Sequence, residues 1–295
     1  MRILLVGGNG QVGHELRRSL APLGEVIVTT RSGELDDGPA LACDLMELGA
    51  PAAIVQEIQP DIIVNATAYT AVDKAENDRD VAFRVNAGAV EELAKECAVF
   101  DIPLIHYSTD YVFDGQGERP YLPNDATSPL GVYGESKLAG EEAIRASGAK
   151  HMVLRTAWVY GMHGHNFLKT MLRVGAERDE LRVVSDQVGS PTPAWLIANV
   201  TAQILQQGIG ANGTHHVVSA GQASWHGFAE AIFDEAVATG ALQRKPVVHA
   251  IPTSEYPTPA RRPAWSVLDT GSLREAYGIV LPGWREALSQ TMMRG

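Results

Sequence analysis

The sequence YGESK places Tyr133 and Lys137 four residues apart. On a helix, this spacing puts both side chains on one face, one turn apart. A free tyrosine has a pKa of about 10. A cation about 4 Å away, at an effective dielectric constant of about 20, contributes about 4 kcal/mol, or roughly three pKa units before desolvation opposes it. Lys137 is therefore expected to bring the Tyr133 phenol toward neutral pH, where proton transfer works best, and to hold a cofactor ribose.

A candidate oxyanion-stabilising hydroxyl precedes this pair. The sequence HYSTDYVF closes a predicted strand, and Thr109 stands at the carboxyl end of that strand. A hydroxyl there can donate a hydrogen bond to a developing alkoxide. The alternative is that Thr109 caps a turn, which is a common use of threonine.

Three glycines near the start of the chain predict a dinucleotide site. Gly7, Gly10 and Gly13 form GxxGxxG directly after the apolar run at residues 2–6. Glycine permits a tight turn and lets backbone N–H groups approach a pyrophosphate, and the third glycine lets helix and strand pack closely. A plain strand-to-helix turn is the alternative, but the position between a strand and a patterned helix favours the cofactor site.

The end of the second predicted strand bears on the choice of cofactor. It has the sequence Thr29-Thr30-Arg31-Ser32, where NAD-selective sites usually place an acid on the ribose hydroxyls. Two hydroxyls and Arg31 suit a 2′-phosphate, so NADPH is favoured and NADH is left open. The alternative is that Arg31 is a solvated loop residue.

The elements that must position these residues alternate in type along the first half of the chain. Apolar runs of strand length are separated by segments with helical spacing, and Ser128-Pro129 suits the N-cap and first turn of the helix that carries Tyr133. This order predicts an α/β fold of Rossmann type, a doubly wound parallel sheet that binds ligands at the carboxyl ends of its strands. The expected strands are residues 2–6, 25–30, 61–66, 102–108 and 151–159, and the expected helices include residues 51–58 and 81–100.

The second half is richer in glycine, proline and tryptophan and has less regular patterns. Helices are expected at residues 194–207 and 225–239, and a strand at 214–219 lies between them. We therefore expect a Rossmann domain at residues 1–160, joined by that strand, and a smaller mixed α/β substrate-binding lobe at residues 161–295.

Composition excludes several classes of protein. The chain has 295 residues, 45% of them hydrophobic, and a formal net charge of −11. No cluster of Lys and Arg predicts nucleic-acid binding, and no segment approaches the ~20 apolar residues of a membrane span. The N-terminus lacks the apolar region and cleavage site of a signal peptide. Cys43 and Cys97 show no metal-ligand spacing, so we expect two reduced structural thiols in a cytoplasmic protein.

Several motifs together carry a family resemblance. The sequences GGNGQVG, YSTDYVF and YGESKLAGEE resemble the extended short-chain dehydrogenase/reductases, whose glycine spacing is GxxGxxG. The resemblance narrows to the dTDP-4-dehydrorhamnose reductase family with NATAYTAVDKAE at 65–76, RTAWVYG at 155–161 and DQVGSPT at 186–192. GTHHVVSAG at 213–221 and RRPAWSVLD at 261–269 extend it over most of the chain.

The resemblance implies an NAD(P)H-dependent reduction of the C4 keto group of a dTDP-linked 4-keto-6-deoxyhexose, which yields dTDP-L-rhamnose. It implies that Tyr133 donates the proton, that Lys137 tunes it and that Thr109 stabilises the oxyanion. Asp110 and Trp158 are expected to touch the sugar. The implied cofactor contacts are Gly10, Gln11 and Val12 at the pyrophosphate, Asp44 and Leu45 at the adenine, and Ala68, Tyr69 and Thr70 beside the nicotinamide.

Two departures and three alternatives remain. Tyr69 stands where the family pattern leads us to expect His, and Tyr111 stands where dehydratase relatives have an acid, which favours reduction over water elimination.

One alternative is a reductase of another nucleotide-linked keto-deoxysugar. Another is a non-catalytic regulatory subunit that binds NADP, against which the intact Thr109, Tyr133 and Lys137 argue. His163 and His165 could bind a metal, although a substrate-loop or solvated role is favoured. Mg²⁺ is left open, although no residue pattern supports it, and a homodimer is an open expectation.

Overall fold

The fold is described by a computed structural model that covers residues 1–294. A seven-stranded parallel sheet has the order β13-β8-β7-β6-β1-β2-β5. The expected doubly wound α/β sheet is thereby confirmed. Its strands are β1 (Arg2–Val6), β2 (Glu25–Thr30), β5 (Leu41–Ala42), β6 (Ile62–Asn65), β7 (Leu104–Thr109), β8 (His151–Thr156) and β13 (Gly213–His216).

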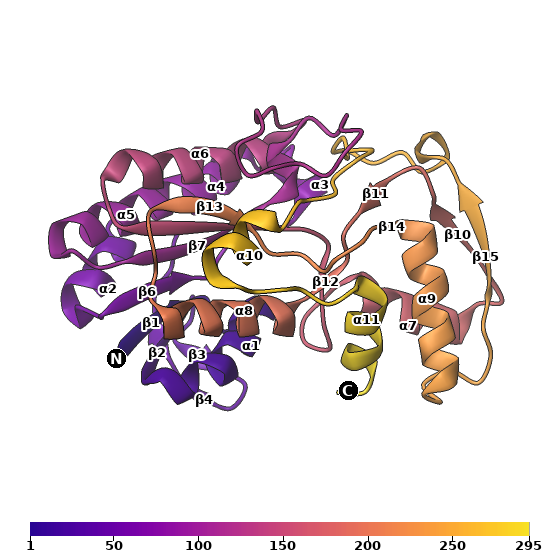
Figure 1. The fold of residues 1–295 in the computed structure, drawn as a ribbon, viewed down its shortest axis with the longest axis horizontal. Coiled ribbons are helices and arrows are strands. Elements are labelled where there is room, and N and C mark those ends of the chain that lie inside the picture. The colour runs from indigo at the N-terminus through magenta and orange to yellow at the C-terminus, as the bar shows by residue number, and fades with distance from the viewer. Residues whose placement is uncertain (295) are drawn as a thin grey trace.

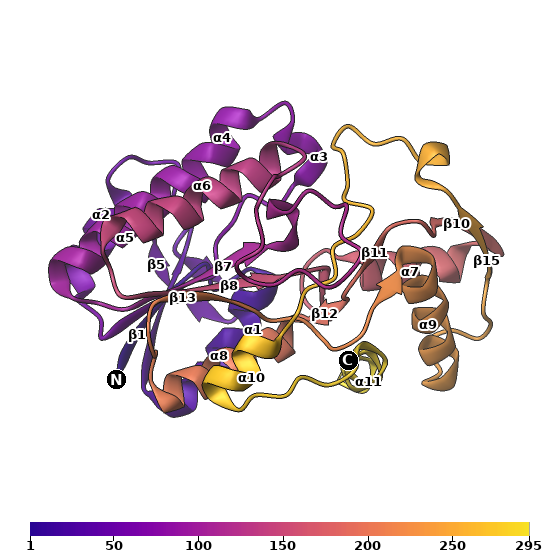
Figure 2. The same cartoon turned by 45° about the horizontal axis from the view of Figure 1, so that its top comes forward.

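Successive side chains of the strands point to opposite faces of the sheet and pack into two separate hydrophobic cores. Ile3 and Leu5 of β1 face one helical layer, and Leu4 and Val6 face the other, as the period of two along a strand requires. Figure 2 shows the two layers on opposite faces of the sheet. One layer contains α1 (Gln11–Leu20), α8 (Ala194–Gln207) and α10 (Gly271–Tyr277), and the other contains α2 (Ala50–Ile58), α5 (Ala89–Phe100) and α6 (Val132–Ser147).

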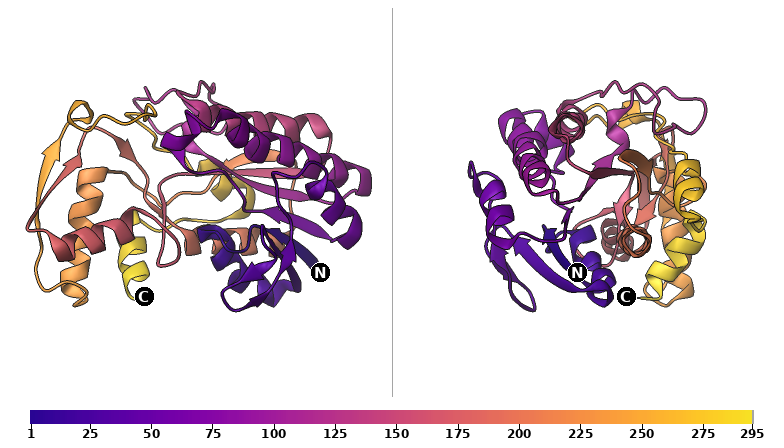
Figure 3. Two further views of the ribbon diagram at one scale, coloured as in Figure 1. Left: turned by 180° about the vertical axis from the view of Figure 1, so that it is seen from behind. Right: turned by 60° about the vertical axis from the view of Figure 1, so that its left-hand side comes forward.

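Beyond the carboxyl ends of the strands lies a second lobe, on the right of Figure 1 and on the left of the rear view in Figure 3. Its helices share one apolar core of aromatic and aliphatic side chains. The elements of the lobe are α7 (Phe167–Glu177), α9 (Trp225–Ala238), α11 (Trp284–Met292) and the parallel strands β10 (Glu180–Val184) and β15 (Val247–Ile251).

Short elements connect these parts. They are β3 (Glu34–Leu35), β4 (Gly38–Pro39), β9 (Val159–Tyr160), β11 (Val188–Gly189), β12 (Thr192–Pro193), β14 (Ala223–Ser224), α3 (Val72–Ala75), α4 (Arg79–Phe83), a π-helical turn (Arg84–Gly88) and 3-10 turns at Ala21–Leu23, Asp110–Val112 and Thr253–Glu255. No helix within residues 1–294 is long and apolar enough to cross a membrane.

The division at residue 160 stays a prediction, and the chain crosses it repeatedly. Helix α8 packs against α1, and β13 pairs with β8 at the edge of the main sheet, so both contribute to the Rossmann layers. The strand expected at residues 214–219 is thus present as Gly213–His216.

Several expected boundaries are wrong. The helix expected at residues 81–100 is interrupted by the π-helical turn at Arg84–Gly88, and the strand expected at 214–219 ends at His216. Two further errors lie beside the site. Helix α6 begins at Val132 rather than at Ser128-Pro129, because its first turn is bound by another segment: the Val132 N–H donates to Glu76 Oε1 at 3.0 Å. Strand β8 ends at Thr156 rather than at residue 159. There the backbone of Trp158 enters the left-handed region with φ of 47°, which a continuing strand does not allow.

Candidate active site

Four adjoining cavities follow the carboxyl ends of the strands. The first, of about 410 Å³, extends from the glycine loop to β2. The second, of about 370 Å³, shares Asn9, Gly10, Thr67 and others with the first. A third of about 350 Å³ shares Tyr133 with the second, and a fourth of about 290 Å³ shares Trp225 with the third. The cleft therefore runs from the first lobe into the second.

The glycine loop has the geometry of a phosphate cradle. Gly7 has φ of 91°, and a Cβ at Gly13 would lie 2.0 Å from the Gly7 carbonyl oxygen, so neither position accepts a side chain. In the described chain, no side chain caps the start of α1 at Gly10. The first N–H groups of α1, which include those of Gln11 and Val12, are left to bind an anion at a helix N-terminus. These residues fit the pyrophosphate of a dinucleotide.

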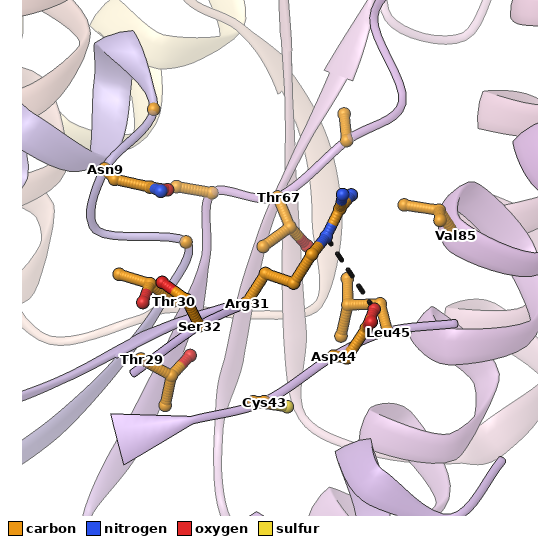
Figure 4. A pocket seen from close by; sticks show the side chains of 14 residues that line it. Asn9, Thr29, Thr30, Arg31, Ser32, Cys43, Asp44, Leu45, Thr67 and Val85 are labelled. Carbon is orange, nitrogen blue, oxygen red and sulfur yellow. Dashed lines mark ion pairs between the residues drawn. The ribbon is translucent and has the colours of Figure 1, made fainter. Parts of the chain in front are cut away.

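The far end of the first cavity is formed by the ends of β2 and β5. Figure 4 shows Arg31, Asp44 and Leu45 around it, with Nε of Arg31 3.8 Å from Oδ1 of Asp44. Arg31 is 77% exposed, so its guanidinium is accessible to a ligand. Thr29 Oγ1 is buried without a hydrogen-bond partner among residues 1–294. The structure thus brings the predicted adenosine-side residues to one cavity.

The second cavity brings together the catalytic pair Tyr133 and Lys137 with Ala68 and Thr70, which were predicted beside the nicotinamide. Gln11 and Val12, predicted at the pyrophosphate, line it too. Tyr69 is placed differently. Its hydroxyl donates to Asp78 Oδ2 at 2.8 Å, and its side chain is not among the residues that line these four cavities. Its cofactor contact stays a prediction.

Tyr133 and Lys137 line the same cavity, but their electrostatic relation differs from the expectation. Nζ of Lys137 points toward β7, where it donates to the Tyr107 carbonyl oxygen at 2.7 Å and lies 3.0 Å from His106 Nε2. Burial raises the pKa of Tyr133 to about 12, and only the nearby Thr109 hydroxyl opposes that rise. The expected lowering of the Tyr133 pKa by Lys137 is therefore wrong for this geometry.

The third cavity contains Thr109, Asp110 and Trp158 beside Tyr133. Thr109 Oγ1 accepts from the Tyr111 N–H at 3.2 Å and donates to Asp110 Oδ1 at 2.9 Å. It therefore caps a turn, as the alternative interpretation held, and also faces the cavity. Burial raises the pKa of Asp110 to about 6, although hydrogen bonds that include one from Thr109 oppose the rise.

Trp158 is fixed by its neighbours in a strained backbone conformation. Its ring stacks on Trp225 with centroids 3.5 Å apart and an interplanar angle of 4°. Gly189 also lies against the ring, since a Cβ there would be 2.5 Å from Trp158 Cε2. A non-glycine residue with positive φ persists only where its surroundings enforce it, and such positions cluster at ligand sites.

The fourth cavity is in the second lobe and was not predicted. Its walls combine aromatic rings with two guanidinium groups, and its members include Phe167, Arg182, Trp225, Tyr256 and Arg262. The sequence patterns predicted only that Trp225 begins a helix, and that the second half of the chain is rich in proline with less regular patterns. The sequence feature that could have predicted this cavity is the clustering of aromatic and basic residues in segments without helical or strand spacing. Arg262 also forms an ion pair with Asp73 at 2.7 Å, which joins this lobe to α3.

Buried polar residues behind the cavities were also missed. Asn86, in the π-helical turn, accepts from the Tyr69 N–H at 2.8 Å and donates to Ser136 Oγ at 3.0 Å. Nδ2 of Asn65, the last residue of β6, lies 3.1 Å from Nδ1 of His106, which is inside β7. A polar residue inside an apolar strand was the available signal, because a buried polar group needs a partner.

The histidine loop between β9 and α7 covers the glycine loop. The His163 ring stacks on His14 with centroids 4.1 Å apart, and His163 Nε2 lies 3.0 Å from the Asn9 carbonyl oxygen. His165 lines the second and third cavities. Within residues 1–294, no group of three or more His, Cys, Asp or Glu side chains could hold a metal ion. The geometry is that of a loop beside a ligand site.

Comparisons with known proteins cover the whole chain. The family model described as RmlD substrate binding domain matches residues 1–295. The dTDP-4-dehydrorhamnose reductase of Escherichia coli K12 is 45% identical over 300 residues, covering 99% of this chain and 97% of its own. That of Burkholderia thailandensis is 47% identical over 300 residues, covering 98% of this chain and 97% of its own.

Solved structures agree. A dTDP-4-dehydrorhamnose reductase of Bacillus anthracis in complex with NADP superposes with a TM-score of 0.90 at 33% identity, covering 100% of this chain and 99% of its own. An orthologue from Clostridium acetobutylicum gives 0.89 at 35% identity, with the same coverage. The UDP-glucose 4-epimerase of Thermus thermophilus, 22% identical with a TM-score of 0.81, shows the shared fold alone.

Proposed function

The chain belongs to the RmlD substrate binding domain family of dTDP-4-dehydrorhamnose reductases, and on that premise we propose that it reduces the C4 keto group of dTDP-4-dehydro-6-deoxy-L-mannose to give dTDP-L-rhamnose. The family resemblance expected from the sequence is thereby confirmed. The cofactor is NADPH, which agrees with the NADP-bound relative from Bacillus anthracis. When bound, NADPH supplies the hydride.

The observation that carries this proposal is the convergence of Tyr133 and Thr109 on the cavity that continues from the glycine cradle. Tyr133 gives its hydroxyl proton to the substrate oxygen as negative charge develops there. Thr109 Oγ1 donates a hydrogen bond to the same oxygen when its hydroxyl hydrogen turns from Asp110 Oδ1 to the substrate. A pKa of about 12 keeps Tyr133 protonated at neutral pH. An alkoxide is a far stronger base than a phenolate, so transfer from Tyr133 remains downhill.

The rest of the cleft supports a nucleotide-linked substrate. Asp110 and Trp158 flank the third cavity, where the sugar would lie. In the fourth cavity, Arg182 and Arg262 offer guanidinium groups to a diphosphate, and the aromatic rings offer a stacking surface to a base. Gly7, Gly10, Gln11, Val12, Arg31, Asp44 and Leu45 would hold the cofactor at the other end.

The test is oxidation of NADPH by the purified chain when dTDP-4-dehydrorhamnose is added, followed by absorbance of the reduced nicotinamide. We expect turnover with this substrate and loss of turnover with the 4-hydroxy product in its place. A panel that varies the base and the sugar separates this activity from reduction of another keto-deoxysugar. Binding of NADPH without turnover on any member of the panel would favour the regulatory alternative and overturn the proposal.

Two expectations remain attached to this function. A homodimer is checked by the mass of the purified chain in solution, and a cytoplasmic location by fractionation of the source cells. Neither enters the chemistry proposed above.

A further inference from the structure

The carboxylate of Asp73 lies between the cofactor end and the substrate end of the cleft. It belongs to residues 66–73, which run along the cofactor side. In this segment Ala68 lines the first and second cavities, Thr70 lines the second and third, and Val72 lines the third. Asp73 itself, in α3, lines none of the four cavities. Its side chain therefore acts on the cleft only through other residues.

The segment that Asp73 contacts is residues 256–262, which form part of the wall of the fourth cavity. Tyr256, Thr258 and Arg262 line that cavity. Residues 256–262 contain no helix or strand, so no regular backbone ladder holds them in place. Figure 2 shows this part of the chain passing beside α3 on its way back to the main sheet.

Asp73 makes three hydrogen bonds to this segment. Its Oδ1 and Oδ2 accept from Nη1 and Nη2 of Arg262 at 2.9 and 2.7 Å. Oδ1 also accepts from the Ala260 N–H at 3.2 Å. Among the described residues 1–294, no other hydrogen bond joins residues 257–263 to a different part of the chain. The position of this wall therefore depends on Asp73.

The ion pair orients the guanidinium group of Arg262. Arg262 holds the pKa of Asp73 below its usual value, so the carboxylate is charged at neutral pH. The side chains of Asp73 and Arg262 are 40% and 23% exposed, so solvent screens the pair only in part. A bidentate pair of this kind fixes direction as well as distance. Nε of Arg262 has no hydrogen-bond partner in the part of the chain that the structure describes, and is left for a ligand.

We propose that Asp73 is a positioning residue that couples the cofactor site to the sugar-nucleotide site, so that each ligand strengthens the binding of the other. The identity of the two ligands rests on the proposed function. A cofactor against Ala68 and Thr70 fixes the segment that ends in Asp73, and Asp73 then fixes Ala260 and Arg262 before the nucleotide binds. Ordering by the first ligand lowers the conformational entropy that the second must remove. Linkage requires the same coupling factor in both directions.

The first test measures this factor by calorimetry with NADP⁺ and dTDP. Because dTDP lacks the sugar that would meet the nicotinamide, coupling between these two ligands passes through the protein. We expect the Kd of dTDP to fall about fivefold or more when NADP⁺ is saturating, and the Kd of NADP⁺ to fall by the same factor with dTDP. Kd values that the other ligand leaves unchanged would overturn the inference.

The variant Asp73→Asn separates coupling from simple support of the cavity wall. It keeps the shape of the side chain but replaces one acceptor oxygen with an amide that faces the guanidinium group. We expect the ratio of the dTDP Kd values without and with NADP⁺ to fall close to 1. A residue that only shaped the fourth cavity would weaken dTDP equally in both conditions and leave the ratio in place, which contradicts coupling through Asp73.

Asp125→Asn is the matched control. Asp125 accepts from Arg119 at 2.8 and 2.9 Å and from the Leu122 N–H at 2.7 Å. It thus has the same kinds of partner as Asp73, but it lines none of the four cavities of the cleft and joins residues that are close in sequence. We expect the parent ratio in this variant. An equal loss of coupling in both variants would show that Asp73 has no special role.

A second measurement needs no substitution and no dTDP. Hydrogen exchange followed by mass spectrometry reports the Ala260 amide in a peptide that spans residues 256–264. We expect NADP⁺ alone to slow its exchange by about fivefold, because the bound cofactor keeps the Ala260 N–H on Asp73. Unchanged exchange in the NADP⁺-saturated chain would overturn the inference, even if Asp73→Asn did not fold. Failure of dTDP to bind at all would instead count against the proposed function.

Discussion

The two ends of the cleft are built in different ways. At the cofactor end, the functional groups come from a glycine turn and the ends of buried parallel strands, where backbone geometry fixes them. At the substrate end, they come from irregular segments held by ring stacking and by the strained backbone at Trp158. The comparison teaches that the first end is set by local rules of chain geometry, and the second by packing between segments far apart in sequence.

The largest expected effect lies where the two ends meet. Tyr133→Phe removes the proton donor while keeping the ring, so kcat should fall by about 10²-fold or more. Cofactor affinity, measured by quenching of protein fluorescence, should change little. Tyr277→Phe is a control outside the cleft, where the hydroxyl accepts from the Gly210 N–H. Near-normal turnover in Tyr133→Phe would show that Tyr133 is not the proton donor.

A second prediction concerns the buried ion pair that joins α6 to β8. Arg155 and Glu141 are 2% and 0% exposed and form a buried pair. Glu141→Gln leaves the arginine charge buried without its counter-ion, which should lower the free energy of unfolding by about 3–5 kcal/mol. Urea unfolding measures this change. Glu177→Gln, in the exposed pair with Arg173, should shift the free energy by less than about 0.5 kcal/mol.

The pair also sets a pH dependence of stability. Burial alone would raise the pKa of Glu141, but the Arg155 hydrogen bonds outweigh it and hold the pKa below its usual range. The folded-state pKa is thus below the unfolded-state value of about 4.3. The stabilisation is complete above that value and is lost as pH falls through the folded-state pKa. In Glu141→Gln this part of the acid loss should be absent.

The third prediction tests packing at the substrate end. In Gly189→Ala the new Cβ would lie 2.5 Å from the Trp158 ring, so the ring must shift from its position in the third cavity. We expect KM for the sugar nucleotide to rise about tenfold, equivalent to about 1.4 kcal/mol, with a smaller change in kcat. Gly213→Ala, where the nearest atoms are 3.8 Å away, serves as the matched control. Equal KM values in the two variants would remove Trp158 from substrate binding.

The smallest expected effect is that of Arg31 on cofactor binding. Arg31 is 77% exposed, so a contact with a 2′-phosphate is screened by solvent. Arg31→Ala should raise KM for NADPH by up to about fivefold, less at high salt, and should leave KM for NADH nearly unchanged. A parallel rise for both cofactors would mean that Arg31 supports the loop and does not read the phosphate.

The sequence predicted the cofactor end of the cleft better than the substrate end. β1 and β2 have the bounds that their apolar runs predicted, because a strand buried on both faces leaves a continuous pattern. The start of α6 predicted from Ser128-Pro129 is wrong, because the side chain that caps this helix is Glu76, which is distant in sequence. Trp225 shows helical spacing whether it faces a core or a cavity, so its place beside Trp158 could not be inferred. The spacing of Tyr133 and Lys137 predicted that they share a cavity. It did not predict that Lys137 Nζ would bind to residues of β7 and point away from Tyr133.

The alternation of α8, β13 and α10 with α7, α9 and α11 along the chain has an evolutionary consequence. Neither lobe is encoded as one contiguous cassette, since segments of the second half complete the sheet layers and return to the outer lobe afterwards. A single recombination event near residue 160 would import foreign sheet-edge and helix-layer pieces together with any new sugar pocket. Substitutions confined to the lining segments would alter the sugar pocket without disturbing the sheet and its helical layers.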